Sequence, residues 1–320
     1  MIEVADYAEF LDREYLGSYV RDGGAAVKFV VTRDDEAAAA FSAAVRTEAD
    51  AAGYVSASVD AATIRVHMMD QVFFDVARQV DWDALATTAV RRALVGASFP
   101  VPDDSADVSV ETVAAQYGVD AGELSRDVNR RLQQDVQRDY AMVGEFRTAM
   151  LRLCQAQLQT GQVTDAEHAA VLDWLTGDLR QISALRSAMI FRRIGRHNGR
   201  QMLFSLSHWL FTNGMAGLFL QLDIRRLGFA RRPRAEERSG VYYTRPALLD
   251  AYELLRQLID NTDELSHCCV VVLASREILA DPNRGINAYQ ALKLRIHDEV
   301  RDRNRDNPFS SLVRLGSEAA

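Results

Sequence analysis

Short apolar runs rich in valine, leucine and phenylalanine recur along the chain, separated by longer segments of helical periodicity. Continuous apolar runs of this length are typical of strands buried on both faces, which form parallel sheets covered by helices. Five runs are predicted to be strands: residues 27–31 (VKFVV), 54–59 (YVSASV), 218–222 (LFLQL), 268–273 (CCVVVL) and 312–315 (LVRL). The predicted fold class is therefore α/β with a parallel sheet.

Helical segments fill the intervals between these runs, with apolar residues at the spacing of one helix face. We predict helices at residues 7–20, 35–52, 70–80, 83–95, 200–211, 245–260 and 288–303.

One interval departs from this alternation. After two prolines, residues 108–190 contain no strand-like run and show helical periodicity throughout. We therefore predict an α/β core formed by residues 1–100 and 191–320, interrupted by a helical insertion lobe at residues 101–190.

Composition excludes several classes of protein. The chain carries 37 lysines and arginines against 45 acidic residues, a formal net charge of −8. A surface that binds nucleic acid or anionic lipid all over needs excess positive charge, so only local basic patches remain to be considered. The three cysteines are too few for a disulfide framework, and the longest apolar run, residues 268–274, is far shorter than the roughly 20 residues of a membrane-spanning helix. We expect a cytoplasmic protein with no membrane partner.

Patterns for metal binding and common catalysis are missing from the sequence. His267, Cys268 and Cys269 are consecutive on a predicted strand, where neighbours point to opposite faces, so they are not expected to hold a metal. The other histidines follow no metal-binding spacing, and no GxSxG nucleophile elbow occurs. No metal site and no catalytic residue are predicted.

Only two of the 37 basic residues are lysines, Lys28 and Lys293. A phosphate-binding loop needs glycines whose N–H groups wrap the phosphates, a lysine directly after them, and a serine or threonine for magnesium. Lys28 lies inside a predicted strand, Lys293 lies within a predicted helix, and neither follows a glycine. The chain therefore has no Walker A motif.

The segment YVRDGGAAVKFVV, followed by a helix and then GYVSASVD, nevertheless resembles the opening of the BrxC/BrxD-like ATP-binding proteins of bacteriophage-exclusion (BREX) defence systems. That family places a P-loop directly after this strand, where this chain has TRDDEAAA. On this match Thr32 and Ala37 replace the glycines, Ala38 the lysine and Ala39 the hydroxyl residue. The side-chain contacts to phosphate are lost, and three consecutive acidic residues add negative charge where phosphates would lie.

The resemblance continues toward the carboxyl end. In GLFLQLDIRRL, Asp223 retains the Walker B aspartate, whereas Ile224 replaces the catalytic glutamate and cannot accept a proton from water. CCVVVLASREIL resembles the family's sensor strand, with Ser275 at or beside the sensor position. DPNRGINAYQALKLRI resembles a segment in which Arg284 and Arg295 match arginines near the nucleotide, and NPFSSLVRL matches too. The resemblance implies a P-loop NTPase, AAA+-like three-layer core.

Two roles stay open for Arg284: an arginine finger toward an adjacent active ATPase, or local capping and pairing in the DPNRG turn. For Arg295 we expect an intrahelical salt bridge, because His297, Asp298 and Glu299 follow closely.

Two further segments are candidates for binding. Residues 225–238 carry a net charge of +4 from Arg225, Arg226, Arg231, Arg232, Arg234 and Arg238 against Glu236 and Glu237. We expect this loop to contact a protein partner rather than nucleic acid. Residues 111–132 have the spacing of a helix-turn-helix, or equally of an ordinary helical hairpin, and the acidic residues of the second helix weigh against groove recognition.

The missing lysine and glutamate, together with the resemblance, imply a pseudo-ATPase without a cofactor. We expect a non-catalytic subunit that scaffolds or regulates an antiphage-defence complex containing an active ATPase, helicase or nuclease. It would act in a homo- or hetero-oligomer and reach DNA through that complex. One alternative is a weak switch that holds ATP by backbone N–H groups and magnesium by Asp223. Another is a DNA-binding module that uses the helix-turn-helix-like segment.

Overall fold

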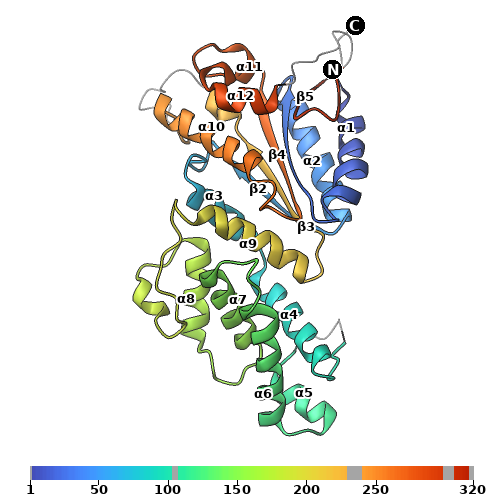
Figure 1. The fold of residues 1–320 in the computed structure, drawn as a ribbon, viewed down its shortest axis with the longest axis vertical. Helices are drawn as coiled ribbons and strands as arrows, with labels where there is room; N and C mark the ends of the chain where they lie inside the picture. Colours follow the sequence, from blue (N-terminus) through green and yellow to red (C-terminus); the bar gives the residue numbers. More distant parts are fainter. Residues whose placement is uncertain (1, 103–106, 229–239, 298–305, 317–320) are drawn as a thin grey trace. The chain divides into compact units, whose positions relative to one another are not determined.

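A computed structural model of the chain describes residues 2–102, 107–228, 240–297 and 306–316. The chain divides into two compact units, Met1–Val76 with Gly214–Ala320, and Ala77–Asn213 (Figure 1). None of the described helices is long and apolar enough to cross a membrane.

The first unit is built on a five-stranded parallel sheet. Its strands are β1 (Ala25–Thr32), β2 (Tyr54–Asp60), β3 (Gly217–Asp223), β4 (Cys268–Ser275) and β5 (Leu312–Leu315), in the order β2-β3-β4-β1-β5. The five predicted strands are thus confirmed, most with one to three extra residues at their ends. A parallel sheet in which β1 is an inner strand is consistent with the P-loop-like core that the family resemblance implied.

Helices cover both faces of this sheet (Figure 1). On one side lie α1 (Val4–Leu11), its continuation η1 (Asp12–Tyr19) and α2 (Asp35–Ala51). On the other lie α10 (Arg245–Asp260), α11 (Glu277–Ala280) and α12 (Gln290–Ile296), while α3 (Met69–Ala77) follows β2. Phe41 and Val45 of α2 pack with Tyr7 of α1 against Val30 and Phe219 of the sheet, and all five are fully buried or nearly so.

The predicted helix at residues 7–20 changes its winding after α1. In η1 the backbone forms wide i to i+5 hydrogen bonds, such as Val20 N–H to the Tyr15 carbonyl (2.8 Å) and Gly24 N–H to the Tyr19 carbonyl (2.9 Å). A Cβ atom on Gly24 would lie 2.6 Å from the Tyr19 carbonyl oxygen and from its ring. Only glycine fits this close return of the chain into β1.

Within its described residues, the second unit consists of helices and the connections between them. It contains α4 (Trp82–Gly96), α5 (Val110–Tyr117), α6 (Ala121–Leu132), η2 (Gln133–Gln137), α7 (Gly144–Gln157), α8 (Asp165–Thr176), η3 (Ile182–Leu185) and α9 (Gly199–Thr212). The predicted lobe spans residues 101–190, whereas this unit also includes α4 and α9. Both helices carry many buried apolar residues, and periodicity alone does not say whether such residues pack on a sheet or on other helices.

The remaining helix predictions agree with the structure at their starts and ends to within a few residues. The exception is 288–303, where α12 ends at Ile296 and residues 298–305 lie outside the described part of the chain.

Candidate functional site

The carboxyl ends of β1, β3 and β4 meet at one edge of the sheet, where open α/β folds bind their ligands. Thr32 pairs in register with Ser275, and Asp223 pairs with Leu273. Three of the candidate positions, Thr32, Asp223 and Ser275, are therefore the last residues of three adjoining strands, as the family resemblance implied.

The connection from β1 to α2 is much shorter than a phosphate-binding loop. Thr32 is buried as the last residue of β1, and only Arg33 and Asp34 precede the first residue of α2. Residues 35–39, which the family match assigned to the P-loop, therefore lie in α2, as the helical periodicity of residues 35–52 predicted. The reason is that alanines are strong helix formers, and an aspartate directly before them is a favoured N-cap.

Asp34 uses the helix terminus that an anion would need. Its Oδ1 accepts a hydrogen bond from the Ala37 N–H at 2.9 Å, and its Oδ2 accepts one from Arg33 Nε at 2.8 Å. These two bonds, the one from Ala37 foremost, hold the pKa of Asp34 below its usual value. Free N–H groups at a helix start are what bind phosphate, and here the protein's own carboxylate occupies one of them.

The two alanines after Ala37 also differ in environment. Ala38, at the lysine position of the match, is fully buried on the face of α2 that carries Phe41 and Val45. Ala39 is exposed. A side chain at position 38 therefore points into the core rather than toward a ligand.

Asp223 is engaged by an arginine two residues further on. Arg225 Nε lies 3.0 Å from both carboxylate oxygens, and Nη2 lies 2.6 Å from Oδ2. The Nη1 of the same guanidinium pairs with Oδ1 of Asp35 in the first turn of α2. These hydrogen bonds, chiefly those to Asp223, raise the pKa of Arg225. We call this arrangement the Asp–Arg–Asp bridge.

The bridge was not foreseen from the sequence, where Arg225 was grouped with the basic loop that follows. The sequence did contain an indication of it, because the side chain of an arginine two residues after a strand-ending aspartate can fold back onto that aspartate.

Ile224 and Ser275 complete the edge. Ile224 is buried, and its N–H donates to the Leu273 carbonyl at 2.8 Å. The Ser275 hydroxyl hydrogen-bonds Glu277, which is the main cause of the lowered pKa of Glu277. Neither residue therefore presents a free acid–base group at the carboxyl edge.

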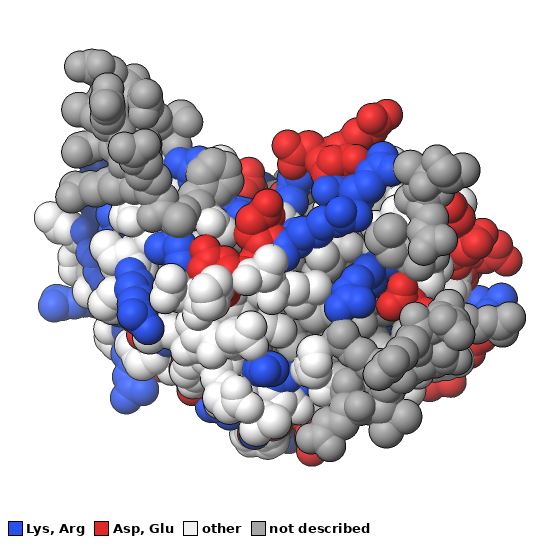
Figure 2. Space-filling model, turned by 90° about the horizontal axis from the view of Figure 1, so that it is seen from above, with Lys and Arg blue, Asp and Glu red and all other residues white. Residues whose placement is uncertain are grey.

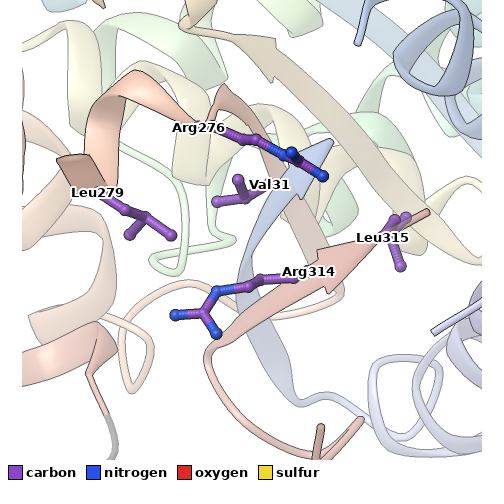
Figure 3. A pocket seen from close by; sticks show the side chains of 5 residues that line it. All are labelled: Val31, Arg276, Leu279, Arg314 and Leu315. Carbon is purple, nitrogen blue, oxygen red and sulfur yellow. The ribbon is translucent and has the colours of Figure 1, made fainter. Parts of the chain in front are cut away.

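A small pocket lies beside the ends of β1 and β5 (Figure 3). Its volume is about 260 Å³, and it is lined by Val31, Arg276, Leu279, Arg314 and Leu315. The guanidinium groups of Arg276 and Arg314 extend in different directions rather than toward one point. Small-molecule sites usually measure about 300–1,000 Å³ and present converging polar groups, so this pocket does not have the form of a nucleotide site.

Figure 2 shows the surface that lies at the top of the view in Figure 1, and acidic and basic side chains lie side by side near the middle of this surface. The bridge follows this pattern of local charge neutralisation.

Arg284 is 8% exposed, and its guanidinium is held inside the first unit. It donates to the Leu227 carbonyl at 3.1 and 3.2 Å and to the Tyr243 carbonyl at 3.0 Å. Its backbone N–H binds the carboxylate of Asp281 at 3.0 Å, as in the DPNRG turn. Of the two roles left open, these contacts support the local one.

Arg295 binds Asp260 of α10, with Nε to Oδ1 at 2.9 Å and Nη2 to Oδ2 at 3.3 Å. This salt bridge joins two helices, because α12 packs beside α10. Asp298 and Glu299, two of the expected intrahelical partners, lie outside the described residues. Arg231, Arg232 and Arg234 lie outside the described residues.

Lys28 is a buried anchor rather than a phosphate ligand. Its Nζ donates to the carbonyls of Phe309 (2.8 Å) and Ser310 (3.2 Å) and lies 4.3 Å from the centre of the Tyr15 ring. It thus ties β1 to the segment that leads into β5.

In the second unit, α5 and α6 form the predicted helix, turn and helix around a left-handed Gly118. The arginines of α6 pair with acidic residues four or fewer positions away. The pairs are Arg126 with Glu123 (4.0 Å), Arg130 with Asp127 (3.1 Å) and Arg131 with Asp135 (2.7 Å). This pairing reduces the positive charge that α6 could offer to a DNA groove.

Fold and edge geometry together define an α/β protein whose five-stranded parallel sheet is consistent with a P-loop-like core. A family model described as BREX system ATP-binding protein BrxC/D matches residues 11–317. The chain belongs to this family, and the resemblance drawn from the sequence is confirmed. No curated protein and no solved structure matches the chain.

The family description implies ATP and, with it, a divalent cation, but the residues present do not fit them. Asp34 occupies the helix terminus, Ala38 faces the core, and Arg225 engages Asp223 through both carboxylate oxygens. Across the described residues, no three His, Cys, Asp or Glu side chains gather as metal ligands.

Proposed function

We propose that the chain is a non-catalytic pseudo-ATPase of the BREX family that scaffolds or regulates a complex containing an active ATPase, helicase or nuclease. The observation that carries this proposal is the Asp–Arg–Asp bridge. A guanidinium of the chain itself lies between the Walker B-like aspartate and the first turn of α2, where an ATPase holds a cation and phosphates.

Electrostatics support the proposal. A divalent cation that binds Asp223 would have to displace a positive group already held by three short contacts. Phosphates approaching α2 would meet Asp34, Asp35 and Glu36, and repulsion between unit charges about 4 Å apart costs about 1 kcal/mol each even in water. Both ligands of the ordinary site are therefore disfavoured.

Titration with a fluorescent ATP analogue, with and without Mg²⁺, tests the nucleotide part of the proposal. We expect no saturable binding up to millimolar concentrations. Saturable, magnesium-dependent binding at micromolar concentration would contradict it and favour the alternative of a weak ATP-dependent switch, which the family description supports.

Co-expression with neighbouring genes, followed by affinity capture of the tagged chain, tests the partner part. We expect a stable complex that contains an active ATPase, helicase or nuclease. A monodisperse monomer that captures none of these would remove the basis for a scaffold.

A further inference from the structure

One stretch of this acidic chain contains no acidic residue. Between positions 179 and 222 there are six arginines and no aspartate or glutamate. All six arginines lie in residues 180–200, on the connection from α8 to the start of α9. We call residues 179–198 the arginine segment, which was not singled out by periodicity because it is mostly neither helix nor strand.

The arginine segment is anchored to the helical unit. Leu185, Ala188 and Ile190 are fully buried. Its backbone is also bound by side chains: the Ser187 carbonyl accepts from Arg152 at 3.0 Å, and the Arg192 carbonyl accepts from Trp174 Nε1 at 2.9 Å. Side chains on the outer face of the segment are therefore displayed from a fixed backbone.

Most of the displayed arginines lack a nearby carboxylate. Arg180, Arg186 and Arg196 are exposed, and none forms an ion pair within the part of the chain that the structure describes. Arg192 is exposed as well, and Oε1 of Glu145 lies 3.7 Å from its guanidinium. The arginines of α6, by contrast, each have an acidic partner. The segment thus keeps positive charge available to an external anion.

Large apolar side chains alternate with this charge. Met189 and Phe191 are 63% and 61% exposed, although Ile190 between them is buried. Met189 has a φ of 61°, a left-handed conformation that costs a non-glycine residue free energy and is more frequent at functional sites. Phe191 therefore offers an open ring face to a ligand.

A second exposed ring and the arginine segment both contact the first turn of α7. The first turn of α7 carries both Glu145, which contacts Arg192, and Arg147, whose guanidinium lies 4.6 Å over the ring of Tyr140. Tyr140 is 81% exposed.

We propose that the arginine segment, together with Tyr140, binds single-stranded nucleic acid. Arginine binds phosphate well because its guanidinium presents several N–H donors in one plane. Exposed aromatic rings stack with unpaired bases irrespective of the nucleotide sequence. Double-stranded nucleic acid stacks its base faces inside the helix, so it would not use the exposed rings. An acidic protein would bind the arginines but would not require the aromatic rings. This activity goes beyond the proposed scaffold role and does not use the altered nucleotide edge.

Fluorescence anisotropy of a labelled 20-mer of deoxythymidine with the full chain tests the proposal. We expect saturable binding at 50 mM salt that weakens with a log–log slope of about −3, since each of four phosphates neutralised on a single strand contributes about −0.7. Arg186→Ala/Arg196→Ala should reduce that slope by about 1.4. Phe191→Ala should weaken binding about fivefold or more without changing the slope.

The matched control is Arg46→Ala/Arg126→Ala, which removes the same charge from arginines that already pair with Asp50 and Glu123. It should bind the oligonucleotide as the unmodified chain does. Failure to bind at 50 mM salt would overturn the proposal. An equal loss of affinity in the control and in Arg186→Ala/Arg196→Ala would overturn it as well and would point to the helix-turn-helix-like segment. Equal affinity for a duplex with no effect of Phe191→Ala would refute the stacking. Tighter binding to a polyglutamate peptide would assign the surface to an acidic protein instead.

Discussion

Replacing Arg225 with alanine is the most direct test of the Asp–Arg–Asp bridge. The change removes contacts of 3.0, 3.0 and 2.6 Å from the carboxylate of Asp223, whose side chain is 18% exposed. Hydrogen bonds to charged groups contribute about 1.5–3 kcal/mol. Because the Asp223 carboxylate regains some water in the variant, we expect the free energy of unfolding to fall by about 2 kcal/mol.

The two halves of the bridge should contribute unequally. The Asp35 side chain is 98% exposed, and exposed ion pairs contribute about 0–1 kcal/mol. Asp35→Ala should therefore cost less than about 0.5 kcal/mol, and it serves as the matched control. The double variant Asp223→Ala/Arg225→Ala should lose less than the sum of the single changes, because it leaves no partly buried carboxylate unpaired.

Denaturant unfolding followed by circular dichroism provides the measurement, with tryptophan fluorescence as an internal reference. The three tryptophans, Trp82, Trp174 and Trp209, all lie in the helical unit, so their signal monitors the unit that does not contain the bridge. If Arg225 stands in for a cation, millimolar MgCl₂ should stabilise Arg225→Ala more than the unmodified chain. The reasoning fails if Arg225→Ala is as stable as the unmodified chain, or if Asp35→Ala is equally destabilising.

Three further changes test other parts of the structure. Arg284→Ala should lower the free energy of unfolding by about 2–4 kcal/mol, since it leaves two buried carbonyls without a donor. Thermal unfolding measures this change, and an unchanged stability would contradict the buried local role of Arg284. The hydrogen bond with Arg256 is the main reason why the pKa of Glu253 is lowered to about 2 in the folded protein. The ionised Glu253 therefore stabilises the fold fully above its unfolded-state pKa of about 4.5, and this contribution is lost as the pH falls toward 2. The stability difference between the unmodified chain and Glu253→Gln should therefore shrink between pH 5 and 2, and a constant difference would argue against the pair. Gly24→Ala should cost about 1–3 kcal/mol by forcing its Cβ against the Tyr19 carbonyl, whereas Gly144→Ala, with its nearest neighbour at 3.6 Å, should change stability far less in the same thermal assay.

The sheet was predictable from the sequence because burial on both faces leaves a local trace. Runs such as VKFVV and CCVVVL are apolar at every position except Lys28, and the structure makes them β1 and β4. The placement of Asp223 at a strand end followed in the same way. Each of these features depends on residues that are neighbours in the chain.

Features that depend on distant residues were missed. The partner of Arg295 is Asp260, 35 positions away, and the bridge joins Arg225 to Asp35 across 190 positions. At the β1–α2 connection the structure follows the predicted helix at residues 35–52 and not the P-loop that the family match placed at residues 32–39. The arginine segment escaped because periodicity detects helices and strands, whereas this segment is ordered by anchoring side chains.

On the proposed function, Asp34 and Arg225 act as a pair. Asp34 takes the place of an anion at the start of α2, and Arg225 takes the place of a cation at Asp223. Ligands that bind only the folded state stabilise it in proportion to the logarithm of their concentration, so an ATPase fold that relies on nucleotide varies in stability with nucleotide supply. Asp34 and Arg225, unlike a bound nucleotide and cation, are part of the chain and are therefore always present. A subunit whose role is assembly would then keep its interfaces whether or not ATP is abundant, and adding ATP and Mg²⁺ should leave its melting temperature unchanged.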